Sequence, residues 1–274
     1  MPKIKIATFN VNSIKARLPR FLEWLKDSSP DIVLLQEIKC VEENFPFEVL
    51  LDAGYNAAVS GQKTYNGVAI LSKFKIEDVS KELPILNGEI DEQARYIEGV
   101  ISVEDTAIRV SSIYVPNGGG ELAEDEDLRD SKKFLYKMEF FNRLKSHFSS
   151  LLAFDEIQVF GGDYNVGMEE IDVYSPKSLE GTVCFHQEER QKFRTLLNLG
   201  FADSYRAHNQ DSQAFTWWDY RGGSWQQNKG MRIDYLLTSP KASDKIFEAT
   251  IEDKGVRDQE KASDHCPAIV VLDI

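Results

Sequence analysis

The sequence predicts a single α/β (α+β) domain built on a mixed β-sheet, or on two sheets packed together. Short apolar runs with the length and composition of buried strands recur along the whole chain. Amphipathic helical segments separate only some of them, whereas a purely parallel sheet needs a crossover between every pair of strands. The chain has 274 residues, 42% of them hydrophobic, and no linker or low-complexity tract. We therefore expect one domain that spans residues 1–274.

The elements follow from local periodicity. The apolar runs predict strands at 4–10, 31–37, 67–72, 96–102, 108–115, 157–163, 232–239 and 268–274. The 3.6-residue period predicts helices at 17–29, 131–152 and 186–201; in the first, Leu18, Phe21, Leu22 and Leu25 share one face. Strand–helix–strand occurs early and again in the middle of the chain. The two halves are therefore expected to be rough copies of one another.

Composition limits the class of protein. The net charge of −13 counts against a nucleic-acid partner, unless a local basic surface coexists with an acidic remainder. Part of that charge lies in residues 121–127, "ELAEDED", which we expect to form a solvated loop or helix start. Three unclustered cysteines predict a reducing compartment without a disulfide framework. With no signal-peptide pattern and no apolar run near ~18 residues, we expect a soluble, cytoplasmic protein without membrane contact or an obligatory protein partner.

Polar side chains of a narrow type collect at the strand ends. Four predicted strands end in them and two begin with them: Asn10 and Asn12, Gln36 and Glu37, Tyr114 and Asn117, Asp163 and Asn165, then Asp234, and finally Asp264 and His265. Sites in open sheets gather at one edge of the strands. If all six groups share that edge, the last two strands must run antiparallel to the first four.

The chemistry of this set is that of a divalent cation facing a phosphate ester. Carboxylate and amide oxygens without thiolates or a histidine cluster suit Mg²⁺ or Mn²⁺; the candidates are Glu37, Asp163, Asp264, Asn10, Asn12 and Asn165. Asp163 is a candidate to activate water, and Asp234 could orient His265. Hydrogen-bond donors to a phosphate would be Asn10, Asn165, Tyr114 and His265.

Each residue alone has a simpler explanation. The glycines, Asp163 and Asn165 of "VFGGDYNVG" are common turn formers. Glu37 could merely end a strand, His265 could be a structural histidine, and Tyr114 could be a packing aromatic. The joint occurrence of the set at strand ends favours a site.

The motifs also resemble a known family. In order, they are "TFNVNSIKAR", "LLQEIK", "YNGVAILSK", "DEQARYIEG", "SIYVPNG", "FGGDYNV", "FTWWDYR", "MRIDYLL" and "ASDHCPAIV". Over residues 3–274 this order resembles exodeoxyribonuclease III and related abasic-site endonucleases of the endonuclease/exonuclease/phosphatase superfamily. The resemblance implies a DNase I-like four-layer α/β sandwich, with two packed mixed β-sheets flanked by helices.

The resemblance also implies residue roles. Glu37 would bind the metal, with Asn10 beside it. Asp163 would activate the water and Asn165 would contact the phosphate, both with a part in metal binding. Tyr114 would lie against the phosphate or leaving oxygen, Asp264 would be a possible second-metal ligand, and His265, supported by Asp234, would contact the phosphate. Asn12 stands where some relatives have an aspartate, which makes a two-metal arrangement less secure.

Substrate contacts are expected from scattered polar and aromatic groups. The segment 217–232, "WWDYRGGSWQQNKGMR", mixes aromatic residues with Arg221, Lys229 and Arg232, which suits a duplex-gripping loop or a pocket for a flipped-out sugar. By resemblance Trp217 lines an abasic pocket while Trp218 packs in the core. Met231 replaces a tryptophan of some relatives. The predicted substrate-binding set is Asn12, Arg95, Asn117, Trp217, Arg221, Met231 and His265.

The predicted function is a Mg²⁺-dependent nuclease of DNA repair, with Mn²⁺ expected to substitute. It would cut duplex DNA 5′ to abasic sites, degrade it from 3′ to 5′ and clean blocked 3′ ends. Two alternatives stay open: a phosphodiesterase acting on a lipid or inositol phosphate, and a non-catalytic nucleic-acid-binding relative.

Overall fold

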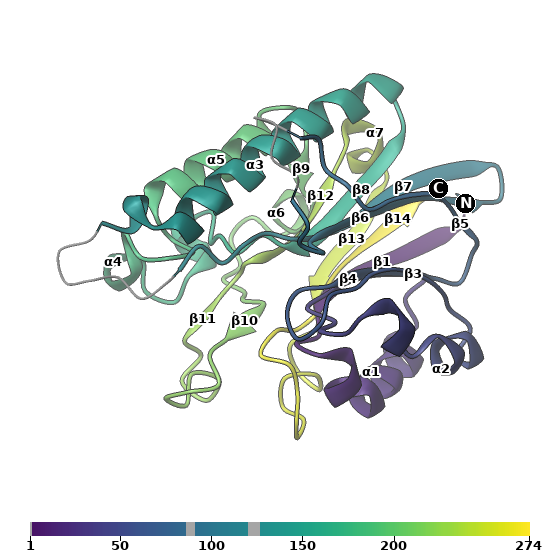
Figure 1. The fold of residues 1–274 in the computed structure, drawn as a ribbon, viewed down its shortest axis with the longest axis horizontal. Coiled ribbons are helices and arrows are strands. Elements are labelled where there is room, and N and C mark those ends of the chain that lie inside the picture. Colours follow the sequence, from purple (N-terminus) through teal and green to yellow (C-terminus); the bar gives the residue numbers. More distant parts are fainter. Residues whose placement is uncertain (1, 86–90, 120–126) are drawn as a thin grey trace.

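The computed structural model describes residues 2–85, 91–119 and 127–274, and its architecture is a four-layer sandwich (Figure 1). Two six-stranded sheets pack face to face. The helices α3 and α5 cover the outer face of one sheet, and α1 and α2 cover that of the other. Apart from Asp127, the acidic stretch 121–127 lies outside the described residues.

The first sheet has the strand order β13 (Ile246–Ile251), β14 (Ala268–Asp273), β1 (Lys3–Asn10), β2 (Ile32–Gln36), β4 (Val68–Ser72) and β3 (Asn56–Ser60). The second has the order β5 (Ile76–Ser80), β6 (Tyr96–Val103), β7 (Thr106–Tyr114), β8 (Ile157–Asp163), β12 (Asp234–Thr238) and β9 (Ala202–Asp203). A small hairpin joins β10 (Trp217–Trp218) to β11 (Gly230–Met231).

The helices are α1 (Ile14–Ser28), α2 (Phe47–Asp52), α3 (Lys132–Leu151), α4 (Pro176–Leu179), α5 (Gln187–Leu197), α6 (Ser204–His208) and α7 (Pro240–Ser243). Single 3₁₀ turns occur at Glu42–Asn44, Leu128–Asp130, Leu152–Phe154 and Glu170–Asp172. Within the described ranges, no helix combines the length and the hydrophobicity that a membrane span requires.

The two sheets share one topology. In each, the two central strands are parallel and joined by a helix, as β1–α1–β2 and β7–α3–β8, while all other neighbours are antiparallel. The halves are therefore copies at the level of strand order. β12 runs antiparallel to β8, and β14 runs antiparallel to β1, as the shared-edge hypothesis requires.

Strand alternation builds the core. Along β1, Ile4 and Ile6 face the second sheet, whereas Ala7 and Phe9 face α1. Successive side chains of a strand point to opposite faces, so each central strand contributes to two apolar layers.

The two glycines of "VFGGDYN" lie inside β8 rather than in a turn. A Cβ at Gly162 would lie 2.1 Å from the Ile113 carbonyl oxygen, and one at Gly161 would lie 2.6 Å from Leu34 Cδ1. Only glycine lets β8 approach β7 and the opposite sheet this closely, so the strand continues to Asp163.

Candidate active site

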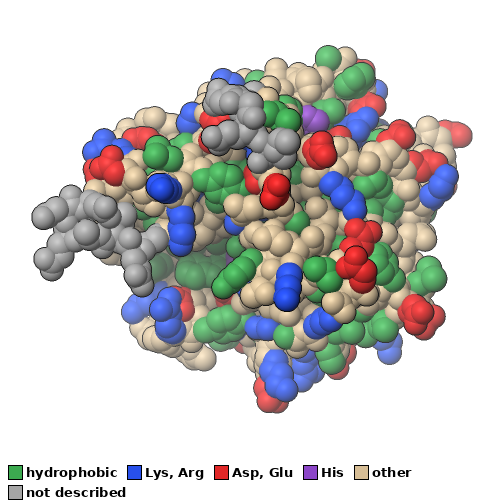
Figure 2. Space-filling model, in the orientation of Figure 1, with side chains coloured by type: hydrophobic (Ala, Val, Ile, Leu, Met, Phe, Trp, Pro, Cys, Tyr) green, Lys and Arg blue, Asp and Glu red, His purple; other side chains and the backbone are tan. Residues whose placement is uncertain are grey.

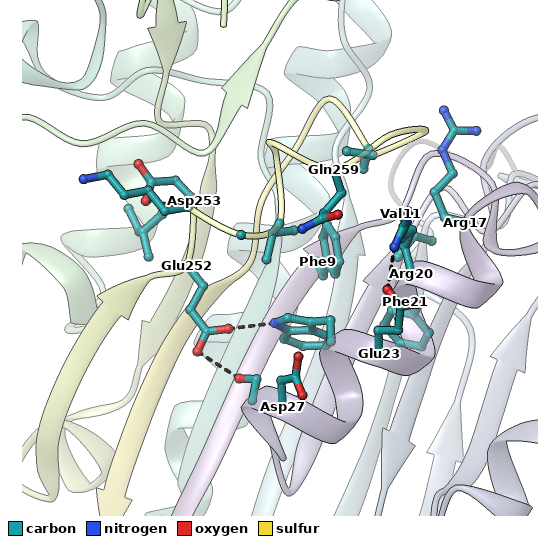
Figure 3. A pocket seen from close by; sticks show the side chains of 18 residues that line it. Phe9, Val11, Arg17, Arg20, Phe21, Glu23, Asp27, Glu252, Asp253 and Gln259 are labelled. Atoms are coloured by element: carbon teal, nitrogen blue, oxygen red, sulfur yellow. Dashed lines mark hydrogen bonds and ion pairs between the residues drawn. The ribbon is translucent and has the colours of Figure 1, made fainter.

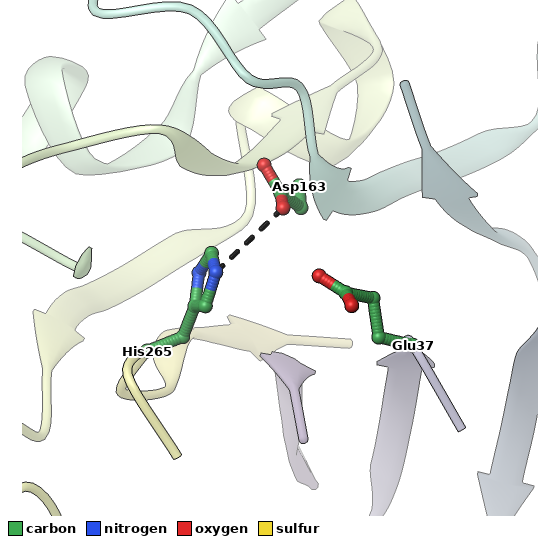
Figure 4. A group of neighbouring side chains, drawn as sticks. All are labelled: Glu37, Asp163 and His265. Atoms are coloured by element: carbon green, nitrogen blue, oxygen red, sulfur yellow. Dashed lines mark ion pairs between the residues drawn. The ribbon is translucent and has the colours of Figure 1, made fainter. Parts of the chain in front are cut away.

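The predicted polar residues converge at one edge of the two sheets. Tyr114 and Asp163 end β7 and β8 and lie side by side in register, and Asp234 begins β12 opposite Asp163. Glu37 follows β2, and His265 precedes β14. Figure 4 shows Glu37, Asp163 and His265 facing one another. Their possible ligand atoms all lie within 4.8 Å of one another.

Asn10 joins the two sheets at the centre of the site. This buried side chain donates through Nδ2 to Glu37 Oε1 at 2.8 Å and to Asp163 Oδ2 at 3.0 Å. Its Oδ1 accepts from the Asn12 amide at 3.0 Å. The carboxylates of the two sheets are therefore held together by one amide.

Asp163 is buried and carries a strongly perturbed carboxyl group. Burial, together with the nearby Asp234 and Glu37 carboxylates, raises the pKa of Asp163 to about 8. His265 and Asn10 act in the opposite direction and lower this pKa in part. Its Oδ1 accepts from the Asn165 amide at 2.9 Å. A carboxyl of this kind can accept a proton near neutral pH, and a cation beside it would favour the ionised form.

His265 forms a buried ion pair with Asp234. Its Nδ1 lies 2.9 Å from Asp234 Oδ2, and its Nε2 lies 3.8 Å from Asp163 Oδ2. Burial alone would lower the pKa of His265, but the neighbouring carboxylates, Asp234 foremost, raise it to about 10. An imidazolium has no lone pair for a metal, so this side chain is suited to donate a hydrogen bond to an anion.

Glu37 has a cationic neighbour that the sequence did not identify. Burial alone would raise its pKa, but Lys39 and Asn10 together lower it below the usual value. Lys39 Nζ lies 2.7 Å from Glu37 Oε2 and also donates to Asn12 Oδ1. The backbone of Glu37 is left-handed, with φ of 51°, which turns this carboxylate out of the strand and into the site.

Tyr114 faces the same carboxylates. Burial, and then the charges of Glu37 and Asp163, raise the pKa of Tyr114 well above its usual value, so the phenol keeps its proton and remains a donor. Arg95 stacks over the ring at 4.7 Å and donates to the Tyr114 carbonyl at 3.3 Å. In the structure Arg95 therefore supports Tyr114 directly.

Asn165 and Asn117 form a pair on the loops after β8 and β7. Asn165 donates to the Val115 carbonyl at 2.9 Å and accepts from Asn117 Nδ2 at 3.1 Å. Cys184 lies against both amides, with Sγ 3.6 Å from Asn165 Oδ1. Burial raises the pKa of Cys184 to about 12, so the thiol stays protonated.

Asp264 lies at the edge of this group, outside the set whose ligand atoms converge. Its two carboxylate oxygens accept from Asn12 Nδ2 at 2.9 Å and from Trp217 Nε1 at 3.1 Å. These contacts make Asp264 the link between the metal-side residues and the aromatic wall of the site. Its role as a second-metal ligand stays a prediction.

A cavity of about 600 Å³ opens over these residues. Figure 2 shows a hollow in the left half of the molecule, where Figure 1 places α4 and the β10–β11 hairpin. Its lining includes the predicted Glu37, Tyr114, Asn117, Asp163, Asn165, Trp217, Arg221, Met231, Asp264 and His265. It also includes Asp219, Ser224 and Lys229 of the predicted segment 217–232, and five residues that no sequence signal identified as lining: Tyr174, Leu179, Val183, Cys184 and Ile233.

The segment 217–232 divides between the core and the surface. Trp218 is buried, as predicted, and Trp217 reaches the cavity. Arg221 is 90% exposed and pairs with Asp219 at the cavity rim. The prediction that Arg232 belongs to the DNA-facing cations is wrong. Its side chain is 1% exposed because it pairs with the buried Asp172 and Asp203.

The donor set fits a hard divalent cation. The half-buried carboxylate of Glu37 and the buried one of Asp163 converge, with the amides of Asn10 and Asn165 around them, and no thiolate lies among the converging ligand atoms of the described residues. Because His265 is committed to Asp234, the ligands left to a metal are oxygens, which is the preference of Mg²⁺ and Mn²⁺.

A second cavity, of about 510 Å³, lies between α1 and residues 251–263 (Figure 3). Its aromatic floor contains Phe9, Phe21 and Trp24, and charges of both signs surround it. Glu252 accepts from the Trp24 indole at 2.7 Å. Among the residues that the structure describes, the acidic, histidine and thiol groups of this cavity do not converge as those of the first cavity do.

The comparisons with known proteins agree with this geometry. The model of the Endonuclease/Exonuclease/phosphatase family matches residues 7–265. The chain is 30% identical to an exodeoxyribonuclease of Bacillus subtilis, covering 99% of this chain and 100% of that protein. An AP endonuclease from Archaeoglobus fulgidus superposes with a TM-score of 0.90 at 37% identity, covering 99% of this chain and 100% of that one.

A 3′ phosphatase from Neisseria bound to a product DNA hairpin has the same TM-score of 0.90 at 34% identity, covering 99% of this chain and 100% of that one. These likenesses extend over the complete sandwich and over both sheets that carry the site. The chain belongs to the endonuclease/exonuclease/phosphatase family, among relatives named exodeoxyribonucleases and AP endonucleases.

Proposed function

We propose that this protein is a Mg²⁺-dependent DNA repair nuclease that hydrolyses phosphodiesters in duplex DNA. One observation carries the proposal: Glu37 and Asp163 converge opposite an Asp234-oriented His265, at the floor of a cavity walled by Trp217. Oxygen ligands, a perturbed carboxyl group and an imidazolium together suit attack of water on a phosphate.

The residues that would hold the cation are Glu37 and Asp163, with Asn10 beside them, Asn165 nearby and Asp264 as a candidate second-metal ligand. When bound, Mg²⁺ or Mn²⁺ would polarise a phosphate oxygen and offset the charge that develops on it. Since Lys39 pairs with Glu37 and contacts Asn12, one cation is a simpler fit than two.

The chain's own groups carry the proton transfer and the phosphate contacts. The Asp163 carboxylate would accept a proton from the attacking water, because its pKa lies near the working pH. The Tyr114 phenol, the Asn165 amide and the His265 imidazolium would donate to phosphate oxygens. Each preorganised donor of this kind is worth roughly 3–4 kcal/mol where negative charge develops.

Relatives and cavity shape support abasic DNA and 3′ ends as substrates. Named relatives include exodeoxyribonucleases, an AP endonuclease and a 3′ phosphatase bound to a product DNA hairpin. The cavity has an aromatic and apolar wall formed by Trp217, Met231, Val183 and Leu179, which suits a sugar that carries no base. We therefore propose incision 5′ to abasic sites, 3′–5′ exonuclease activity and removal of 3′-blocking groups.

Local cations would hold the duplex on an acidic protein. Figure 2 shows Lys and Arg side chains interspersed with acidic ones over the face in view. Arg221 and Lys229 lie at the cavity, so phosphate contacts there would give affinity without sequence preference. The proposal also places the protein in the cytoplasm, a reducing compartment that its three free, buried cysteines support. It assumes no obligatory protein partner.

The proposal is tested with a duplex that contains a single abasic analogue, in Mg²⁺ and in EDTA, using the wild type and Asp163→Asn. Metal-dependent incision that is lost in the variant supports it. Binding without incision would indicate a non-catalytic relative, and turnover only on a lipid or inositol phosphate would indicate a different phosphodiesterase. Either of these results overturns the proposal.

A further inference from the structure

Lys137 of α3 is a buried cation behind the wall of the catalytic cavity. Its side chain and that of its partner Glu189 on α5 are both 0% exposed. The ammonium donates to Glu189 Oε1 at 2.6 Å, to the Asn165 carbonyl at 2.7 Å and to the Asn117 carbonyl at 3.0 Å. These three acceptors match its three hydrogens, so the group is fully satisfied.

Stability alone does not account for this arrangement. Removing two charges from water is costly, and a well-packed apolar pair often replaces a buried ion pair without loss of stability. What the ammonium provides is a fixed geometry for the two carbonyls that it contacts, because a satisfied buried network rigidifies its members.

Those carbonyls belong to the two asparagines of the candidate site. Asn117 and Asn165 also bond to each other through their side chains, at 3.1 Å. Asn165 has a left-handed backbone with φ of 52°, a conformation that asparagine adopts more readily than most residues. The chain passes so close to Lys137 at Gly118 that a Cβ there would lie 2.8 Å from Lys137 Cδ.

Glu189 extends the same link to a third segment. Its Oε2 accepts from the His186 amide at 3.0 Å in the capping box of α5. The residues just before His186 include Val183 and Cys184, which line the cavity. One ammonium thus ties together the loops after β7 and β8 and the segment that leads into α5.

We propose that Lys137 is a positioning residue for phosphodiester hydrolysis: through the Asn117 and Asn165 carbonyls, it fixes the backbone that carries the hydrogen-bonded Asn117–Asn165 side-chain pair at the candidate site. This inference rests on the proposed function. Lys137 has no exposed surface and would not touch the substrate, so its loss should slow the chemical step more than it weakens substrate binding.

The test compares Lys137→Met, the double variant Lys137→Met/Glu189→Leu, and Arg143→Met as a matched control. Arg143 lies on the same helix and is also buried in an ion pair, with Asp91 at 2.7 Å, but its acceptors lie outside the catalytic site. On an abasic duplex in Mg²⁺, we expect kcat of both Lys137 variants to fall 10- to 100-fold with KM within about twofold. Arg143→Met should change Tm but not kcat.

A second readout does not require catalysis. The side-chain amide NMR signals of Asn117 and Asn165 should shift in the Lys137 variants and stay in place in Arg143→Met. If the wild type fails to incise DNA, the proposed function fails. The NMR signals alone then decide whether Lys137 positions the Asn117 and Asn165 side chains. A folded double variant with kcat within twofold of wild type, or with unshifted amides, overturns the inference. The inference is also overturned if neither Lys137 variant folds, because the Lys137–Glu189 pair would then be required for folding rather than for catalysis.

Discussion

His265 Nδ1 lies 2.9 Å from Asp234 Oδ2, in a site where both side chains are buried. Asp234 begins β12 opposite Asp163, so the ring is held between two carboxylates that one antiparallel pair presents side by side. This arrangement fixes the orientation and the charge of the imidazole before any substrate arrives.

Replacing Asp234 with Asn should lower the pKa of His265 from about 10, because Asp234 is the main group that raises it. A raised histidine pKa stabilises the folded state fully below the unfolded value of 6.5, and this contribution is lost as pH rises through about 10. The variant should therefore be less stable than the wild type at neutral pH. Its kcat should fall on the order of 10²-fold, because His265 would no longer be held as a charged donor to the phosphate. Imidazole ¹⁵N NMR across pH checks the pKa; an unchanged His265 titration would contradict this prediction.

Replacing Asp163 with Asn keeps the size of the side chain but removes the proton acceptor. We expect kcat for incision to fall on the order of 10³-fold, while duplex affinity holds or rises because one negative charge is lost. Single-turnover kinetics and DNA titration separate the two effects. Asp155→Asn, at a side chain that is 89% exposed, is the control. A residual kcat within tenfold of wild type would mean that another group activates the water.

Trp217→Ala should weaken abasic-duplex binding by about 1–3 kcal/mol, because the indole no longer removes apolar sugar surface from water. Trp217→Phe keeps a ring but removes the indole donor to Asp264, whose oxygen it contacts at 3.1 Å. We expect the Phe variant to retain part of the lost affinity. The measurement is the Kd for abasic and for undamaged duplexes. Equal losses on the two would show that Trp217 does not read the abasic site.

Asp172→Asn should destabilise the protein by about 3 kcal/mol at pH 7, since it breaks a buried pair with Arg232 and Arg206. Burial alone would raise the pKa of Asp172, but the two guanidiniums hold it below 3.8. The stabilisation is thus present above pH 3.8 and is lost as pH falls through the lower folded value. Urea unfolding at neutral and acid pH should show the gap between wild type and variant closing in acid; a constant gap would refute the charge pairing.

The central strands and most of the site could be predicted from the sequence, because apolar runs and strand-end polar residues are local signals. The edge strands β3, β5 and β13 gave no such signal, because their partly exposed residues lack a continuous apolar run. The edge strand β9 is only two residues long and gave none either. Side chains on β5 and β13 alternate poorly, and register shifts interrupt the pairing of both.

The errors within the site have a tertiary origin. Arg232 looked like a DNA contact because its partner Asp172 lies 60 residues away in sequence. The sequence did not show that Lys39, two residues after Glu37, forms an ion pair with that carboxylate. The pairing accompanies a left-handed backbone at Lys39, which no sequence pattern marked. The cavity wall from Tyr174 to Cys184 comes from a segment without a strand or an extended helix, so no period marked it.

The most direct test of the account is a crystal soaked in Mn²⁺ and measured for anomalous scattering. We predict one strong peak within bonding distance of Glu37 and Asp163, on the cavity side of Asn10, and no such peak in Glu37→Gln. A soaked crystal without a peak there, or with manganese bound only elsewhere, would contradict the claim that these carboxylates form a metal-dependent hydrolytic site.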